Sequence, residues 1–415
     1  MRYVIIGNGA AGVHAAESIR RLDSAGSIKI IAGEEAPPYC RPMISNVLEG
    51  AASFEQISLR QPDFYRSYSI DAVVGERVET VDLAAWQVIT GGGRKFPYDR
   101  LLIAAGADPA RAKCPGADLE NVFYLRTERD TRNILSALPR VKRAVVLGGG
   151  LVGLKAAHSL LRRGISVTML IGSKHPLSMQ VDDFAGKLVL DELSRHGIDV
   201  RTRSEAAAFE GEKAVQRVRQ TDGSVLACDM VIIGKGVRPA VSALPREQIE
   251  VGTGVCVNDY METSAAGVFA AGDVAESMDI ARRRRRVNAL WPVAVEQGQI
   301  AGMNMAGRRV RYRGSLSRNI IRVFDLDVLT AGLTAPPAED GCDILSRFDA
   351  RRRLYRRLVF REDRLVGFVM LNSVEQGGLL MSLIHQEIPV RIPREKLLEN
   401  SFNYSRVAPM YGGRS

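Results

Sequence analysis

The sequence predicts an α/β protein with two Rossmann-like domains of the three-layer ββα type and a smaller C-terminal α+β domain. The main observation is a Gly-x-Gly-x-x-Gly turn that occurs twice, beginning at Gly7 and at Gly148. Each turn follows a short apolar run and precedes a helix-like segment, as the strand–turn–helix unit of this fold requires. A second observation is that the pattern changes to short β-strands from about residue 313.

The domain organisation follows from chain length and motif order. With 415 residues the chain is too long for one ordinary core, so two or three domains are expected. We expect the second domain to be inserted into the first, because a strand of the first pattern returns after Val237-Arg238-Pro239. The predicted boundaries are 1–112 with 246–312 for the first domain, 113–245 for the second, and 313–415 for the third.

The first unit contains its expected elements in order. The apolar run 3–6 leads into the first turn, a helix is predicted over 13–22, and a second strand over 28–31. Glu34 follows that strand and lies 22 residues after Gly12, where a ribose-binding acid belongs in a dinucleotide-binding domain.

The remaining strands and helices are assigned in the same way. In the two Rossmann-like domains, further strands are predicted at 100–104, 144–147, 167–171, 230–233 and 267–271. In the C-terminal domain, strands are predicted at 320–323, 355–360 and 365–371, followed by a helix at 374–384.

The spacing of the glycines in each turn has a physical reason. The first glycine permits the tight turn, the second lets the backbone approach a pyrophosphate, and the third lets helix and strand pack closely. The pyrophosphate then lies at the positive N-terminus of the helix. Two such turns predict two dinucleotides on one chain, whereas a single one could be a connecting loop.

The second unit differs from the first where an acid is expected. Aligning the two units places Ser173 opposite Glu34 and Lys174 in the next position, and no acid lies between Val167 and Gln180. An acid would favour NAD, whereas a hydroxyl and a cation could receive the 2′-phosphate of NADP. The residues therefore favour NADP over NAD, with a solvent-facing Lys174 as the alternative.

Composition excludes several classes of protein. No segment approaches the roughly 20 apolar residues of a membrane helix, and the first strand begins at Arg2, which leaves no room for a signal peptide. We therefore expect a cytoplasmic protein. The five cysteines are scattered and the five histidines show no ligand spacing, so no metal or iron–sulfur site is predicted.

The net charge of +10 is concentrated in two clusters, Arg282–Arg286 and a group made of Arg351, Arg352, Arg353, Arg356 and Arg357. These are either solvated surfaces or a docking surface for an acidic partner. Nucleic acid is disfavoured because neither cluster contains interleaved aromatic residues or a recognition motif.

Together these motifs resemble the FAD-dependent pyridine nucleotide–disulfide oxidoreductase superfamily. The segment 38–45 (PYCRPMIS) matches the Tyr-x-Arg/Lys-Pro-x-x-Ser pattern, and Gly272-Asp273 matches the Gly-Asp that binds the flavin ribityl chain. Trp291-Pro292 with the residues after it resembles the helix that faces the flavin. The branch with the greatest similarity contains rubredoxin reductases, ferredoxin reductases and nitrite reductase flavoproteins.

The resemblance implies FAD and NAD(P)H as cofactors and assigns residues to each. For FAD these are Gly7, Gly9, Ala10, Ala11, Gly12, Glu34, Arg41, Pro42, Ser45, Val78, Ala105, Gly106, Gly272, Asp273, Gln297 and Gly298. For NAD(P) they are Gly148, Gly150, Leu151, Val152, Gly153, Ser173, Lys174 and Gly234. A helix beginning near Gln297 would present its positive end to the flavin.

The implied function is an NAD(P)H oxidoreductase that passes electrons through flavin to a separate acidic carrier, such as a rubredoxin or ferredoxin, or to an iron–sulfur partner subunit. One alternative is an oxidase, or a peroxide or disulfide reductase, that uses Cys40 as a redox thiolate. Another is a flavin subunit of a larger complex with a degenerate nicotinamide site, since Lys155 stands where many relatives have glutamate. A homodimer is compatible with the sequence, which leaves the oligomeric state open.

Overall fold

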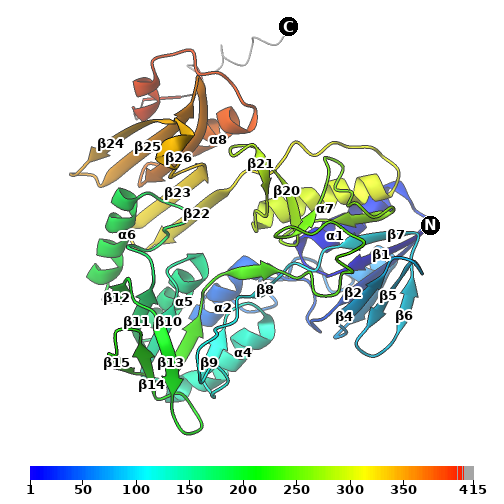
Figure 1. Ribbon diagram of the computed structural model, residues 1–415, viewed down its shortest axis with the longest axis horizontal. Coiled ribbons are helices and arrows are strands. Elements are labelled where there is room, and N and C mark those ends of the chain that lie inside the picture. Colours follow the sequence, from blue (N-terminus) through cyan, green and yellow to red (C-terminus); the bar gives the residue numbers. More distant parts are fainter. Residues whose placement is uncertain (400, 404, 406–415) are drawn as a thin grey trace.

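The computed structural model describes residues 1–399, 401–403 and 405. It contains two Rossmann-like domains and a C-terminal sheet domain (Figure 1). The predicted boundaries of the three domains remain predictions, and residues 400, 404 and 406–415 of the third lie outside the described part of the chain.

The first Rossmann-like domain is built on a five-stranded parallel sheet whose order is β19-β7-β1-β2-β3. Its central strands β1 and β7 end in buried apolar runs, because both faces of a parallel sheet are covered there. The strands are β1 (Arg2–Ile6), β2 (Ser27–Ala32), β3 (Ile70–Val74), β7 (Arg100–Ile103) and β19 (Val268–Ala270). Helices α1 (Ala10–Leu22) and α7 (Trp291–Met305) pack on each other, and a meander is formed by β4 (Val78–Asp82), β5 (Gln87–Thr90) and β6 (Lys95–Pro97).

The second Rossmann-like domain repeats this plan. Its parallel sheet has the order β12-β11-β10-β16-β9, with β9 (Val122–Tyr124), β10 (Arg143–Leu147), β11 (Ser166–Ile171), β12 (Asp199–Thr202) and β16 (Met230–Ile233). Its helices are α4 (Glu128–Ala137), α5 (Leu151–Arg162) and α6 (Asp183–Arg195). Its meander is β13 (Ala206–Glu210), β14 (Arg217–Gln220) and β15 (Val225–Ala227).

The connections between the two domains run side by side. Strand β8 (Ala107–Pro109) leaves the first domain and pairs antiparallel with β17 (Val237–Pro239), which returns from the second. Strand β19 then completes the first sheet beside β7, although 165 residues or more separate them in the chain. The sheet therefore contains strands from both sides of the inserted segment.

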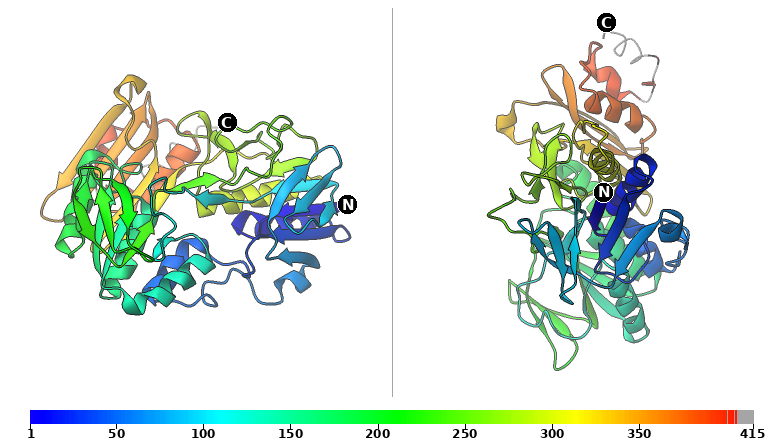
Figure 2. Two further views of the ribbon diagram at one scale, coloured as in Figure 1. Left: turned by 60° about the horizontal axis from the view of Figure 1, so that its bottom comes forward. Right: turned by 90° about the vertical axis from the view of Figure 1, so that its right-hand side faces the viewer.

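The C-terminal domain is an antiparallel sheet of order β22-β23-β26-β25-β24 with helix α8 against it. Figure 2 shows this sheet standing beside the second Rossmann-like domain. Its elements are β22 (Arg318–Val323), β23 (Leu326–Gly332), β24 (Asp343–Asp349), β25 (Leu354–Arg361), β26 (Arg364–Leu371) and α8 (Gly377–His385). The smaller elements of the chain are α2 (Ile44–Glu49), α3 (Phe64–Ser67), β18 (Val255–Cys256), β20 (Ala275–Asp279) and β21 (Arg284–Arg286).

The fold class is confirmed, and one helix start is corrected. Helix α7 begins at Trp291 rather than near Gln297, because Pro292 is suited to the first turn of a helix; Leu290 occupies the N-cap position without a side-chain hydrogen bond. Gln297 therefore lies in the second turn. None of the helices in the described part of the chain is both long and apolar enough to cross a bilayer.

A buried acid joins the second domain to the C-terminal domain. Glu192 of α6 is fully buried and accepts hydrogen bonds from Arg353 Nη1 at 2.7 Å and from the backbone N–H of Asp325 at 3.0 Å. Arg195 adds a further ion pair at 2.8 Å. Glu192, His196 and Asp325 each have a possible metal-ligand atom, and these atoms lie within 4.8 Å of one another. The carboxylate of Glu192, however, already contacts the guanidinium groups of Arg195 and Arg353. This cluster therefore acts as an interdomain contact.

The two arginine clusters are not uniform surfaces. The first cluster includes strand β21, which pairs with β20. Arg282 is largely buried and forms an ion pair with Asp279. Arg283 contacts Glu387, and Arg285 contacts Glu250. Exposed Arg284 and partly exposed Arg286 have no ion-pair partner among the described residues. In the second cluster, Arg356 is buried in the C-terminal domain and donates to the backbone carbonyl of Glu399.

Candidate functional site

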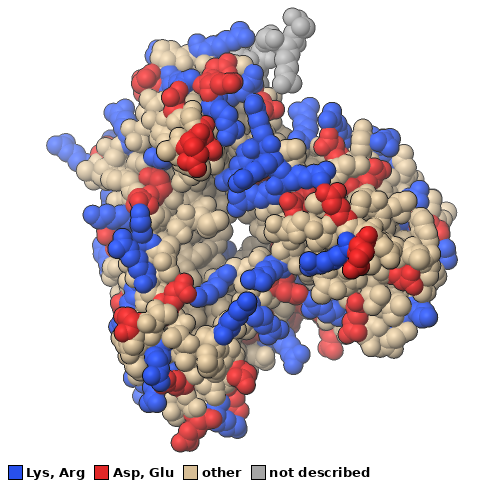
Figure 3. Space-filling model, in the orientation of Figure 1, with Lys and Arg blue, Asp and Glu red and all other residues tan. Residues whose placement is uncertain are grey.

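A cavity of about 1620 Å³ lies where the three domains meet. It is larger than the roughly 300–1,000 Å³ of ordinary small-molecule sites, as a site for a dinucleotide and a second ligand must be. All three domains contribute to its wall, for example Gly7 from the first, Leu151 from the second and Ile320 from the third. Figure 3 shows the molecule hollowed at its centre, with basic side chains gathered around the opening.

The two glycine-rich turns have the same geometry. Gly7 and Gly148 have φ values of +108° and +101°, in the region that favours glycine. A Cβ on Gly12 would lie 2.0 Å from the carbonyl oxygen of Gly7, and one on Gly153 would lie 2.0 Å from that of Gly148. These contacts give the close strand–helix packing that the third glycine of each motif predicts.

The middle glycines face open space instead. A Cβ on Gly9 or on Gly150 would meet no atom within 4 Å. Each lies immediately before a helix, α1 or α5, whose first backbone N–H groups have no partner within the helix. Both positions therefore fit the approach of a pyrophosphate group.

Sixteen of the predicted cofactor residues line the cavity. For FAD these are Gly7, Gly9, Ala10, Ala11, Glu34, Arg41, Pro42, Ser45, Val78, Ala105, Gly106, Gly272 and Asp273, and for NAD(P) they are Leu151, Val152 and Gly234. The others are not among the residues that line it, namely Gly12, Gln297, Gly298, Gly148, Gly150, Gly153, Ser173 and Lys174. The binding role of each residue remains a prediction.

Glu34 lies in a network with its neighbours in the 38–45 segment. Arg41 Nη2 contacts Glu34 Oε1 at 2.5 Å, and the Tyr39 hydroxyl donates to Glu34 Oε2 at 2.8 Å. Burial raises the pKa of Tyr39 well above its usual value, so the hydroxyl remains a donor at neutral pH. The acid predicted from spacing is thus held at the cavity wall by residues of the same motif.

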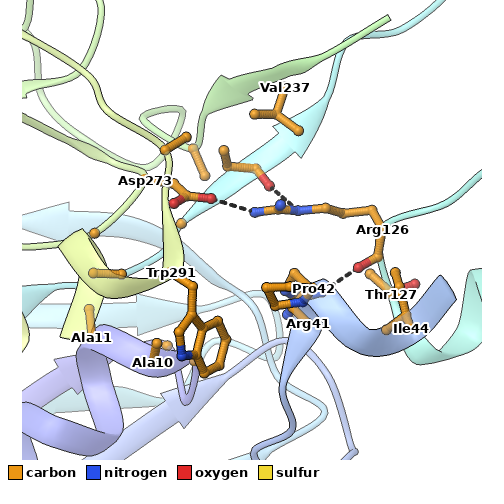
Figure 4. A pocket seen from close by; sticks show the side chains of 18 of the residues that line it. Ala10, Ala11, Arg41, Pro42, Ile44, Arg126, Thr127, Val237, Asp273 and Trp291 are labelled. Carbon is orange, nitrogen blue, oxygen red and sulfur yellow. Dashed lines mark hydrogen bonds and ion pairs between the residues drawn. The ribbon is translucent and has the colours of Figure 1, made fainter. Parts of the chain in front are cut away.

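Arg126 is a site residue that the sequence did not reveal. It precedes α4 of the second domain, and its Nη2 forms an ion pair with Asp273 at 2.9 Å. Its Nε donates to the carbonyl of Ala107 at 3.1 Å, and its own carbonyl accepts from Arg41 at 2.6 Å (Figure 4). Arg126 therefore links Arg41 to Asp273 across the cavity. No motif marked it, because its partners lie 85 and 147 residues away.

Gln297 and Gly298 support the site from behind. The Gln297 amide is buried and accepts from the backbone N–H of Gly272 at 2.8 Å, while its nitrogen donates to Ser277 at 3.0 Å. Gln297 thereby fixes the turn that presents Asp273. A Cβ on Gly298 would lie 2.3 Å from the carbonyl oxygen of Ala11, which shows how closely α7 approaches α1.

Three donors, two on helix α5 and one at its C-cap, hold the second domain against the 38–49 segment. Lys155 Nζ, Ser159 Oγ and Arg163 Nε, spaced four residues apart, donate to backbone carbonyls of Pro42, Ser45 and Leu48 at 3.0, 2.8 and 2.9 Å. Lys155 also lines the cavity, and burial lowers its pKa. The residue that departs from the family pattern thus places a cation at the cavity wall.

Cys40 does not line the cavity and is half-buried against apolar side chains. Burial raises the pKa of its thiol, with smaller opposing effects from the backbone N–H of Met43 and from Lys155. A redox cysteine requires an accessible thiolate. The guanidinium of the neighbouring Arg41 contacts Glu34.

Comparison with known families identifies the chain. Residues 1–298 match the family described as pyridine nucleotide-disulphide oxidoreductase. The chain belongs to this family. Residues 318–388 match a second family, the rubredoxin NAD+ reductase C-terminal domain, which coincides with the C-terminal sheet and α8.

Similar proteins support the assignment along the whole chain. A nitrite reductase [NAD(P)H] from Bacillus subtilis is 32% identical over 93% of this chain and 47% of its own length. An assimilatory nitrate reductase electron transfer subunit from the same organism is 28% identical over 96% of this chain and 51% of its own. The chain therefore spans about half the length of these relatives. A structure of a covalent putidaredoxin reductase–putidaredoxin complex has a TM-score of 0.90 and 25% identity over 99% of both chains.

The cofactors of this family, FAD and NAD(P)H, fit the residues present. The open glycines before α1 and α5 leave room for two pyrophosphates, and the cavity accommodates more than one ligand. Glu34 and Asp273 place carboxylates on the wall, where ribose and ribityl hydroxyls can donate to them.

Proposed function

We propose that the protein takes hydride from NAD(P)H and passes electrons through FAD to a separate, acidic iron–sulfur carrier or partner subunit. The observation that carries this proposal is a cavity lined by the first glycine-rich turn, by the first residues of α5 after the second turn, and by a rubredoxin-reductase-type C-terminal domain. Flavin bound there would accept the hydride and release electrons to the acceptor. The protein itself would bind and orient the two cofactors.

The residues at the wall divide this work. The glycine-rich turn before α1 and Arg41 hold the phosphates of FAD, Glu34 its ribose, and Asp273, fixed by Arg126 and Gln297, its ribityl chain. The three α5 donors set the distance between the nicotinamide turn and the flavin side. Because the acceptors are backbone carbonyls, the distance between the two domains does not depend on which side chains occupy the 42–48 segment.

Lys155 affects the electronics of the site. A cation at the cavity wall favours negative charge on a bound flavin, and its desolvation strengthens the interaction. We propose NADPH as the preferred reductant, because Ser173 and Lys174 replace an acid at the end of β11.

Anaerobic mixing of the flavin-loaded protein with NADH and with NADPH tests the proposal. We expect loss of the flavin absorbance near 450 nm, faster with NADPH, followed by reoxidation on adding a ferredoxin or rubredoxin. Flavin that stays oxidised with both nucleotides would contradict the proposed reaction.

Docking of the carrier is expected to depend on Arg284 and Arg286, the two residues of the Arg282–Arg286 run without ion-pair partners. Replacing both by serine should lower kcat/KM for an acidic ferredoxin roughly tenfold at low ionic strength, because long-range attraction accelerates encounter. Reduction of ferricyanide, measured on the same preparations, should change less than twofold.

The matched control is the double replacement of Arg351 and Arg352 by serine, which removes the same charge from the turn before β25. It should leave ferredoxin reduction nearly unchanged. Equal losses in both double variants would show that net charge, rather than the β21 surface, governs association.

Two observations favour a second function. The similar nitrate reductase protein is described as an electron transfer subunit, and Lys155 departs from the usual acid of the nicotinamide site. In that case the chain would work inside a larger complex with little activity alone. A reductase that uses Cys40 is disfavoured, and Cys40→Ser is expected to leave turnover with every acceptor unchanged.

A further inference from the structure

The two Rossmann-like domains end their second and third parallel strands with the same backbone pairing. In the first, the N–H of Gly75 donates to the carbonyl of Glu34 at 3.2 Å, and the N–H of Glu76 to that of Ala32 at 3.1 Å. In the second, Arg203 donates to Ser173 at 3.1 Å, and Ser204 to Ile171 at 3.0 Å. This register makes Arg203 the counterpart of Gly75, just as Ser173 is the counterpart of Glu34.

The counterpart positions share an unusual backbone conformation. Gly75 has φ +78° and Arg203 has φ +52°, so both lie in the left-handed region. The first domain uses glycine there, which adopts this conformation freely. The second uses arginine, one of twelve non-glycine residues with positive φ in the described part of the chain, so the case for Arg203 depends on its side chain.

The Arg203 side chain is exposed, and its guanidinium has no hydrogen-bond or ion-pair partner within the described residues. Nearby arginines differ in this respect. Arg201 contacts Asp199 at 3.2 Å, and Arg217 contacts Glu210 at 2.6 Å. Lys174 is also partnered, by Asp183 at 3.6 Å. Arg203 is therefore a cation next to Ser173 that forms no ion pair with any of the described residues.

We infer that Arg203 binds the 2′-phosphate of NADPH beside Ser173, whose hydroxyl donates to the carbonyl of His175 at 2.7 Å; this inference rests on the proposed use of a nicotinamide nucleotide. A planar guanidinium can donate two parallel hydrogen bonds to a phosphate, which an ammonium cannot match. The sequence alone offered Ser173 and Lys174 without an arginine. The structure brings one next to Ser173 from the end of the neighbouring strand, β12.

One acid near Ser173, Glu205, could instead favour NADH. A Cβ on Gly172 would lie 2.5 Å from Glu205 Oε1, so a carboxylate lies close to the end of β11. Lys235 forms an ion pair with Glu205 at 3.4 Å, which offsets its charge. If Glu205 instead accepted a hydrogen bond from a free 2′-hydroxyl, the protein would prefer NADH.

The test uses the flavin-loaded full-length protein and titration calorimetry with NADP+, NAD+ and 2′,5′-ADP, none of which reduces the flavin. We expect Arg203→Gly to weaken NADP+ and 2′,5′-ADP binding about 10- to 100-fold, the loss of hydrogen bonds between charged groups. NAD+ binding should change less than twofold. The thermal midpoint should not fall, because glycine suits the backbone at this position.

Arg283→Gly is the matched control, because Arg283 has the same φ of +52° and is exposed but lies in the Arg282–Arg286 run. It should leave all three affinities unchanged. Arg203→Lys should give an intermediate NADP+ affinity. The inference is overturned if wild-type protein binds NAD+ as tightly as NADP+, if Arg203→Gly weakens both equally, or if Glu205→Gln selectively weakens NAD+.

Failure of this inference can be told apart from failure of the proposed function. If NADP+ binds through Arg203 but the flavin is not reduced, the phosphate-binding role of Arg203 holds and the proposed electron-transfer reaction is wrong. If NADH reduces the flavin and Arg203 makes no contribution, the proposed reaction holds and the phosphate-binding role of Arg203 is wrong.

Discussion

Replacing Gly298 by alanine is expected to strip the protein of FAD and to destabilise the first domain by about 3 kcal/mol, the upper end for an overpacked core. Gly298 and Gly302 of α7 face Ala11 and Ala15 of α1 across the closest helix contact of the domain. A Cβ on Gly298 would lie 2.3 Å from the Ala11 carbonyl oxygen and 2.7 Å from its Cα. Because these are backbone atoms, the helices themselves must move apart.

The expected loss of FAD follows from what α1 carries. Its first turn contains Ala10 and Ala11, which line the cavity, and its N-terminus is the predicted pyrophosphate site. Displacing α1 therefore moves that N-terminus away from the cofactor. The ratio of flavin to protein absorbance and the thermal midpoint measure the two effects.

The control for stability, rather than for flavin content, is Gly378→Ala in α8; Gly378 lines the cavity, but a Cβ there would meet no atom within 4 Å. Alanine in an open helical position should be neutral or stabilising, because it restricts the unfolded chain. A Gly298→Ala protein with full flavin content and an unchanged midpoint would rule out close helix packing as the constraint at this position.

Replacing Glu192 by glutamine should cost about 3 kcal/mol at neutral pH, the lower end for breaking a buried ion pair, since Arg353 is 28% exposed. The carboxylate is fully buried between α6 and the β22–β23 turn. Burial alone would raise its pKa, but hydrogen bonds from Arg353 and the Asp325 backbone, with the nearby guanidinium charges, hold the pKa of Glu192 below its ordinary value of 4.5.

The pH dependence has a definite sign. Since the folded-state pKa is depressed, the stabilisation by Glu192 is present above pH 4.5 and is lost as the pH falls through the folded-state value. The difference in unfolding free energy between wild type and Glu192→Gln should therefore narrow in acid. Urea unfolding between pH 7 and pH 4 measures this difference.

Glu210→Gln provides the control, because Glu210 also contacts two arginines, Arg217 and Arg219, but within one surface meander. Its loss of stability should be clearly smaller, as expected for an exposed ion pair. Equal effects at the two positions would mean that Glu192 makes no special interdomain contribution.

Much of the fold could be predicted from local sequence patterns. The glycines at 7, 12, 148 and 153 predicted two strand–turn–helix units because their spacing meets a steric requirement within a few residues. Helix α7 was harder. Pro292 marks the start of α7 at Trp291, but the family pattern drew attention to Gln297 instead. Gln297 lies in the second turn of the helix, and its contacts are made in the folded protein.

The sequence by itself determined the two dinucleotide-type turns, the acid at Glu34 and the Gly272-Asp273 turn, because each is specified by neighbours within one strand–turn unit. Only the tertiary structure decided that Arg126 meets Asp273, that Arg203 lies beside Ser173 and that Glu192 joins two domains. These pairs are 147, 30 and 161 residues apart. Packing of parallel strands and docking of domains bring such residues together, and no local periodicity records that outcome.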